Sequence, residues 1–123
     1  MGDCSVDLLE YDETSWTGQR ACQDKIYPAW VLPEGHPLVQ TVAGAVAAVT
    51  GADPSVSRWG FSTNGVATMG RYGIPTVGFA PGLEELAHTT EEWVAVRDLV
   101  TATAVYSLMP AAIADRRAEL ADS

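Results

Sequence analysis

The sequence has few basic residues. Seven Lys and Arg stand against sixteen Asp and Glu in a chain of 123 residues, which gives a formal net charge of −9. A surface of this sign repels the phosphates of nucleic acids and of acidic lipids at long range. We therefore expect neither nucleic acid nor a membrane among the partners of the protein.

Cysteines and long apolar runs are also scarce. Cys4 and Cys22 form no Cys-x-x-Cys pair, which excludes a disulfide framework and favours a reducing, cytoplasmic setting. No apolar run reaches the roughly 20 residues that span a bilayer, and the acidic amino terminus is unlike a secretion signal. No glycine-rich phosphate loop is present either. The chain does contain 47% hydrophobic and 19% charged residues, which is typical of one folded unit with a single core.

One helix is clearly predicted by the spacing of apolar residues. Pro37 suits the first turn of a helix, and Gly51 suits the left-handed residue that ends it. The segment 12–33 is irregular and is predicted to be an extended connector. The other predicted elements are strands at 5–11, 55–61 and 74–79, a short helix at 66–71, and a last helix from 97 to 109 that Pro110 kinks or interrupts before 111–120.

This order of elements predicts an α/β fold in which helices pack on a partial open sheet. Functional loops in such sheets follow the carboxyl ends of the strands. Two loops meet this condition, at 62–65 and at 80–88. We therefore expect the chemistry of the protein to lie in these two loops.

The second loop contains a histidine among carboxylates. His88 is surrounded in the sequence by four acidic residues, and an imidazole beside carboxylates is a candidate zinc ligand. A solvated acidic loop is the alternative, because a zinc site needs three or four convergent ligands. The other histidine, His36, is explained by its place at a helix start. The acidic residues are Glu84, Glu85, Glu91 and Glu92.

The first loop is rich in hydrogen-bonding groups. Ser62, Thr63, Asn64 and Gly65 could hold a substrate carbonyl or carboxylate, although capping of a turn explains the same residues. Arg71 could clamp a carboxylate with two hydrogen bonds, or it could bind the carbonyls at a helix end. The local sequence leaves both alternatives open.

Two longer segments carry a resemblance to a known family. They are residues 61–79, FSTNGVATMGRYGIPTVGF, and residues 81–92, PGLEELAHTTEE, with shorter matches in YDETSWTG at 11–18 and EGHPLV at 34–39. The chain resembles the carboxyl-terminal third of the dinuclear zinc amidohydrolases related to acetylornithine deacetylase, succinyl-diaminopimelate desuccinylase and aminoacylase. Within these enzymes it is most similar to the subgroup from selenium-metabolism neighbourhoods.

The resemblance implies a function. Family members cleave the amide bond of N-acyl amino acids or dipeptide-like substrates with water activated by two metal ions, usually zinc, with cobalt or manganese as alternatives. It assigns a metal ligand to His88 and substrate contacts to the 62–65 loop, Arg71 and Gly82. It also implies that residues 1–33 end an inserted lid domain and its connector, and that residues 34–123 belong to the catalytic domain.

The other metal ligands of the family are missing from the sequence. Family members take them from a His-x-Asp motif, a bridging aspartate and a glutamate pair, and this chain has no His-x-Asp. One histidine cannot hold two zinc ions, so we expect the chain to be inactive alone. Three alternatives follow: a fragment of the hydrolase, one half of a two-chain enzyme completed by an amino-terminal partner, or a non-catalytic binding remnant.

Overall fold

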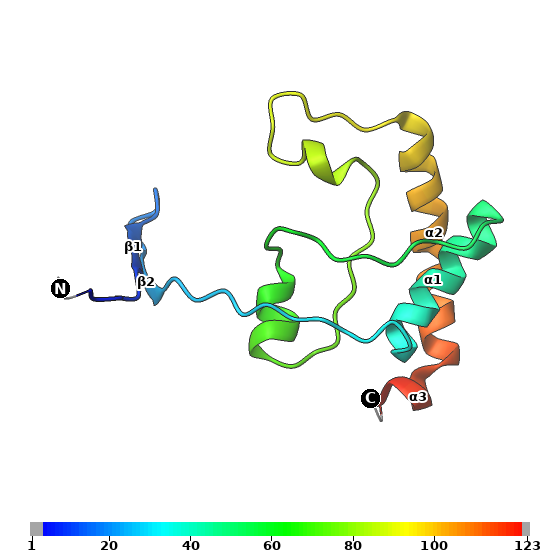
Figure 1. Cartoon of the computed structure of the whole chain (residues 1–123), viewed down its shortest axis with the longest axis horizontal. Helices are drawn as coiled ribbons and strands as arrows, with labels where there is room; N and C mark the ends of the chain where they lie inside the picture. Colours follow the sequence, from blue (N-terminus) through cyan, green and yellow to red (C-terminus); the bar gives the residue numbers. More distant parts are fainter. Residues whose placement is uncertain (1–3, 122–123) are drawn as a thin grey trace.

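A computed structural model of the chain describes residues 4–121 and shows two separate groups of elements (Figure 1). A two-stranded hairpin, β1 and β2, lies at one end of the molecule, and the helices α1, α2 and α3 lie at the other. Extended chain and two short helices, η1 and η2, lie between them. No helix in the described part is long and apolar enough to cross a membrane.

The hairpin pairs β1 (Glu10–Thr14) with β2 (Arg20–Asp24) in antiparallel register, with Asp12 opposite Cys22. All ten of its residues are exposed. Arg20 makes two hydrogen bonds to Asp12. Its Nε donates to Oδ1 and its Nη2 donates to Oδ2, both at 2.6 Å. This ion pair lowers the pKa of Asp12 below its ordinary value of 3.8 and raises the pKa of Arg20.

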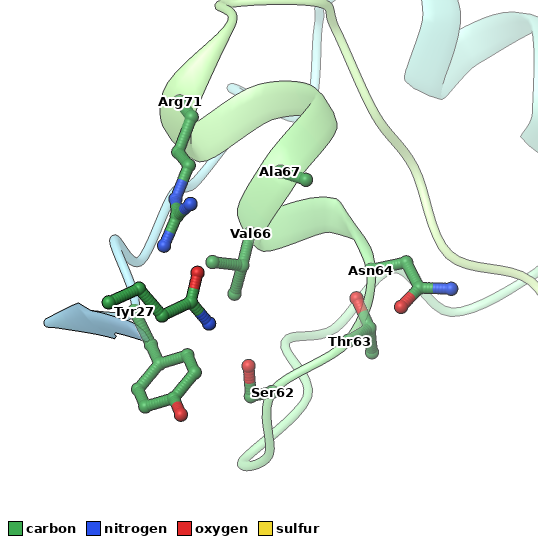
Figure 2. Close-up of a pocket in the computed structure, with 8 residues that line it drawn as sticks. Tyr27, Ser62, Thr63, Asn64, Val66, Ala67 and Arg71 are labelled. Atoms are coloured by element: carbon green, nitrogen blue, oxygen red, sulfur yellow. The ribbon is translucent and has the colours of Figure 1, made fainter. Parts of the chain in front are cut away.

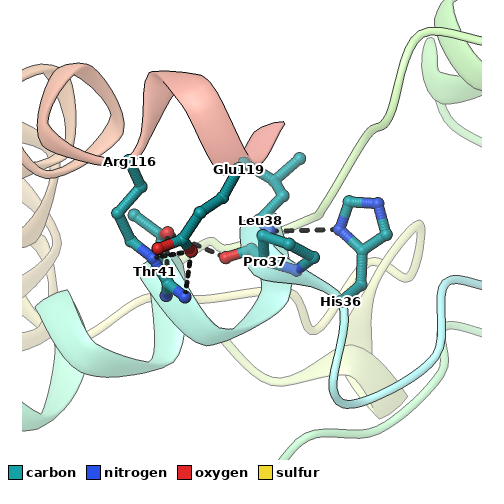
Figure 3. Close-up of polar contacts among 6 residues, drawn as sticks. All are labelled: His36, Pro37, Leu38, Thr41, Arg116 and Glu119. Atoms are coloured by element: carbon teal, nitrogen blue, oxygen red, sulfur yellow. Dashed lines mark hydrogen bonds and ion pairs between the residues drawn. The ribbon is translucent and has the colours of Figure 1, made fainter. Parts of the chain in front are cut away.

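Helix α1 (Pro37–Thr50) begins and ends as the sequence predicts. The backbone amide of Leu38 donates to Nδ1 of His36 over 3.1 Å, so His36 caps the helix, with Pro37 in the first turn (Figure 3). At the other end Gly51 has a φ of 73°, and its amide donates to the carbonyl of Ala47. The predicted helix and the structural explanation of His36 are confirmed.

Helix α2 (Val96–Asp115) packs beside α1 and forms the small core of the protein. The buried hydrophobic residues of this interface are Val39, Ala45, Ala102 and Val105. A short helix α3 (Arg117–Ala121) follows, and Arg116 before it pairs with Glu119 and reaches Thr41 on α1 (Figure 3). The core is therefore a helix pair, with no sheet layer against it in the described residues.

Of the two effects predicted for Pro110, the interruption is wrong, and the kink stays a prediction. Helix α2 continues through Pro110 to Asp115, and the break comes at Arg116. A proline inside a helix removes one amide donor, in this case the bond to the carbonyl of Tyr106. The hydrogen bonds of the flanking turns hold the helix together across this gap.

The predicted strands are largely wrong. Residues 55–61 and 74–79 are extended but belong to no sheet, and of 5–11 only the last two residues lie in β1. An extended segment becomes a strand only when a neighbour accepts and donates its backbone hydrogen bonds. No described segment lies beside them as a ladder partner, so the α/β composition is present without the predicted open sheet. The predicted connector 12–33 contains most of β1 and all of β2 instead.

The fold leaves much apolar surface in contact with solvent. Its accessible area is 9587 Å², whereas a compact monomer of 13.1 kDa exposes about 6,400 Å². Exposed large side chains include Trp16, Val96 and Val100. A surface of this kind is typical of a polypeptide that packs against further protein.

Candidate functional site

A pocket of about 440 Å³ lies where the chain between the hairpin and the helices meets η1. The side chains of Arg71, Tyr27 and Ser62 surround the same space (Figure 2). A volume of this order accommodates a small molecule. Its lining residues are Gln23, Tyr27, Ser62, Thr63, Asn64, Val66, Ala67 and Arg71.

One short helix brings two of the predicted site segments together. The loop residues Thr63 and Asn64 start η1 (Val66–Arg71, a π-helix), because their carbonyls accept from the amides of Val66 and Ala67 at 3.0 Å. Arg71 ends the helix, one turn and a half beyond the loop. The predicted short helix at 66–71 is confirmed, and it places Ser62, Thr63, Asn64 and Arg71 around one pocket.

The lining of the pocket includes one charged side chain. Among the described residues that line it, Arg71 is the one that carries a charge, and the others are neutral polar or apolar. One guanidinium nitrogen of Arg71, Nη2, donates to the carbonyl of Ile26 at 3.4 Å, which is a long contact. The remaining donors of the guanidinium are available to a carboxylate.

Gly65 does not line the pocket, although it lies in the predicted loop. The ring of Trp30 occupies the space that a β-carbon on Gly65 would need, and the indole Nε1 of Trp30 donates to the carbonyl of Thr76 at 3.1 Å. Gly65 therefore serves the packing of the site. Gly82 lies outside the pocket lining, in a turn where its φ of 114° favours glycine.

His88 also lies outside the lining of this pocket, in the loop that follows η2 (Glu84–Leu86). It is exposed, with a φ of 64° that few residues other than glycine adopt. Its amide donates to the carboxylate of Glu92 at 3.2 Å, and its ring stands edge-on to Phe61 with centroids 5.9 Å apart. The contact with Phe61 is the one ring contact that the described structure gives the imidazole.

The loop of His88 is tied to the segment that precedes the substrate loop. The amide of Gly60 donates to Oε1 of Glu84 at 2.8 Å, and Trp59 stacks on Phe61 at 5.5 Å. In the sequence, Glu84 is one member of the acidic cluster around His88. In the structure it links residues 59–61 to the 84–92 loop, so the two predicted functional loops are joined through Glu84 and Phe61.

The described residues do not form a metal site by themselves. Within residues 4–121, no group of three or more His, Cys, Asp or Glu side chains is placed to hold a metal ion. His88 has a suitable donor atom, but the carboxylate of Glu92 already accepts from the backbone beside it. Within residues 4–121, His88 therefore has no second metal-ligating side chain grouped with it in a coordination sphere.

Comparison with known proteins extends this result. Residues 20–111, three quarters of the chain, match the peptidase family M20/M25/M40, and this range includes β2, the pocket and His88. The chain belongs to that family. The family suggests a metal-dependent hydrolase, in agreement with the resemblance seen in the sequence.

Individual relatives support the same assignment. The chain is 41% identical over 105 residues to the protein named "Uncharacterized protein YgeY" of Escherichia coli K12, and equally to the protein of that name in Escherichia coli O157:H7. These matches cover 85% of the chain and 26% of each relative, so this M20/M25/M40 chain spans about a quarter of the length of the curated relatives it matches. No solved structure matches it significantly.

Two pocket residues were missed by the sequence reasoning. Gln23 on β2 and Tyr27 after it belong to the segment that was predicted to be a plain connector. The available signal was Gly70, since a glycine inside a helical segment can indicate close approach of another part of the chain. Gly70 meets the carbonyl of Pro28, whose oxygen lies 2.8 Å from the position of a β-carbon on residue 70.

Proposed function

We propose that this chain supplies the substrate-carboxylate pocket and one metal ligand of an M20-type hydrolase that cleaves the amide bond of N-acyl amino acids or dipeptide-like substrates. The observation that carries the proposal is the position of Arg71, the one charged residue among the described lining of a pocket that otherwise offers hydroxyls and amides. The substrates of the proposed reaction share a carboxylate beside an amide.

The residues of the pocket have distinct roles in this proposal. The guanidinium of Arg71 binds the carboxylate of the substrate, which is the strong, geometrically specific contact. The hydroxyls of Ser62 and Thr63 and the side-chain amide of Asn64 hydrogen-bond the amide group next to it. Val66 and Ala67, the apolar residues of the lining, exclude water from the part of the pocket that they cover.

His88 is proposed as a single ligand, and zinc as the metal. The contact of its ring with Phe61 supports a ligand that is partly oriented before the metal arrives. The remaining ligands come, in this proposal, from an amino-terminal half that is either the rest of a longer chain or a separate partner. The large exposed apolar surface supports such a partner.

A binding experiment on the whole chain tests the pocket. N-acetyl-L-alanine and its neutral analogue N-acetyl-L-alaninamide differ only in the carboxylate, so we expect the acid to bind about tenfold more tightly or better. Arg71→Leu should remove that preference. Arg58→Leu is the matched control, because Arg58 is exposed and lies outside the pocket lining. Equal binding of acid and amide by the unaltered chain would refute the assignment.

A zinc titration tests the ligand. The chain alone should bind zinc weakly, and His88→Ala should remove most of that binding, whereas His36→Ala should retain it because His36 is used as a helix cap. Zinc affinity that is unchanged in His88→Ala would contradict the role of His88.

A non-catalytic binding remnant is the second candidate function. It is favoured by one observation, the absence of a complete metal-binding group in residues 4–121. One experiment distinguishes the two functions. A protein that carries the His-x-Asp and Glu-Glu motifs is added to the chain, and hydrolysis of N-acetyl amino acids is measured. A half-enzyme becomes active, whereas a binding module stays inactive. The assignment to the selenium-metabolism subgroup is a finer proposal, which rests on the resemblance of residues 61–92.

A further inference from the structure

The pocket has a second wall, which comes from a different part of the chain than the substrate loop. Gln23, on β2, and Tyr27, three residues beyond the strand, line the pocket together with the loop residues almost forty positions later. The ring of Tyr27 lies on the opposite side of the open space from Asn64 (Figure 2). A ligand held by Arg71 therefore contacts both walls.

The second wall is held in place by backbone contacts on both sides of Tyr27. The carbonyl of Ile26, the preceding residue, accepts from Arg71, and Pro28, the following residue, packs against Gly70. Farther along, the ring of Trp30 covers Gly65. Because two of these contacts reach η1 and the third reaches Gly65, the residue before it, they position Tyr27 relative to Arg71.

The polar groups of the second wall have no side-chain hydrogen bond within residues 4–121. Neither the side-chain amide of Gln23 nor the phenol hydroxyl of Tyr27 makes a hydrogen bond to another described residue. Together they offer donors and acceptors of both kinds. When an apolar ligand atom lies against such groups, they lose their hydrogen bonds to water and gain none in return. This loss lowers the affinity for an apolar ligand.

We propose that Gln23 and Tyr27 are specificity-determining residues that contact the side chain of the ligand and select an amide- or hydroxyl-bearing side chain over an aliphatic one. The inference rests on the proposed function, in which Arg71 holds the carboxylate. Val66 and Ala67 are the apolar members of the lining and lie on η1 beside Arg71. The part of the ligand beyond the carboxylate therefore meets mainly polar atoms on the hairpin side.

Two ligands of nearly equal shape test the inference. N-acetyl-L-asparagine and N-acetyl-L-leucine have the same branched outline, but only the first can hydrogen-bond through its side chain. The affinities of both for the full chain are measured by amide chemical-shift titration. We expect the asparagine derivative to bind roughly fivefold to tenfold more tightly, as one to two net hydrogen bonds provide. Gln23→Leu and Tyr27→Phe should each move the ratio toward one.

A matched control separates a local effect from damage to the hairpin. Gln19→Leu makes the same change in the turn of the hairpin, outside the pocket lining, and should leave the ratio as it is. Tyr27→Phe keeps the ring and removes only the hydroxyl, so its result is valid even if Gln23→Leu disturbs β2.

The possible failures are distinguishable. If both ligands bind, Arg71→Leu weakens both, and the ratio is unchanged in Gln23→Leu and Tyr27→Phe, then the inference is overturned and the proposed function stands. A preference for the leucine derivative overturns it as well. If neither ligand binds, or if Arg71→Leu changes nothing, the carboxylate pocket itself is refuted and the inference with it.

Discussion

The indole ring of Trp30 lies over Gly65 in the place where a β-carbon on residue 65 would have to be. The same indole donates to the carbonyl of Thr76, so Trp30 connects three segments that are distant in the sequence. This contact brings the segment after the hairpin against the substrate loop. The shape of the pocket depends on it, although neither residue lines the pocket.

Gly65→Ala should therefore displace Trp30. We expect a loss of about 1–3 kcal/mol in the free energy of unfolding, because the ring or the backbone of the loop must shift to admit the methyl group. The indole N–H signal of Trp30, identified with Trp30→Phe, should move and lose its protection from exchange. Gly44→Ala is the control: a β-carbon there meets nothing within 4 Å, and alanine favours the helix. A Trp30 signal that is the same in both variants would contradict the close contact.

Val105 is the one large side chain in the described part that is completely buried, at 0% exposure. Val105→Ala should lower the free energy of unfolding by about 2 kcal/mol, from lost burial and from the cavity that remains between α1 and α2. Val100 lies on the same helix but is 65% exposed, so Val100→Ala should cost well under 1 kcal/mol. Urea denaturation followed by circular dichroism compares the two. Equal losses would mean that the α1–α2 interface is not the core.

The hairpin should be somewhat less stable in acid. The pKa of Asp12 in the folded hairpin is below its ordinary value of 3.8, so the contribution of its pair with Arg20 is present above pH 3.8 and is lost as the pH falls through the lowered pKa. Amide exchange in β1 and β2, measured from pH 6 down to pH 2, should speed up in excess of the intrinsic rate in this acid range. In Asp12→Asn, the protection of these amides from exchange should be low at every pH, as it is in the unaltered chain in acid. Protection in the unaltered chain that does not depend on pH would exclude a role for the pair.

Glu84 should position His88 through the 59–61 segment. Glu84→Ala removes the acceptor of the Gly60 amide, at a cost of roughly 1 kcal/mol, and should loosen the contact between Phe61 and the imidazole. The ring of Phe61 changes the chemical shifts of the His88 ring protons. In Glu84→Ala these shifts should therefore move toward the values measured in Phe61→Leu. Glu84→Gln keeps an acceptor oxygen and should preserve most of the shift. Glu85→Ala serves as the neighbouring control, since no hydrogen bond to its side chain is found in the described structure. An effect of Glu85→Ala equal to that of Glu84→Ala would point to a general loss of charge instead.

The helices were predictable because their signals are local. The apolar spacing of α1, the proline in its first turn and Gly51 at its end all lie within fifteen residues and agree with one another. The strands were not predictable, because pairing depends on a partner elsewhere. Residues 55–61 and 74–79 have apolar, strand-like sequences but no described ladder partner, whereas the hairpin is exposed on both faces and has no apolar alternation to reveal it.

The candidate site divides in the same way. Ser62, Thr63, Asn64 and Arg71 are joined by one helix of six residues, and sequence reasoning named all four. Gln23 and Tyr27 reach the pocket only through the contacts of Pro28 and Trp30 with glycines, which no local pattern specifies. The roles of the predicted residues, including the ligand role of His88, stay predictions that the binding experiments address.

The contacts of residues 26–30 with η1 and Gly65 also determine where the chain tolerates inserted residues. The turn from Ser15 to Gln19 is exposed and closes on its own hydrogen bonds, so a peptide inserted after Thr17 only lengthens the tip of the hairpin. With one extra residue between Ile26 and Pro28, the carbonyl of Ile26 could not contact Arg71 while the ring of Trp30 covers Gly65. Labels, fusion partners and crosslinking sites therefore belong at the tip of the hairpin, and the length of the segment from Lys25 to Trp30 should stay unchanged.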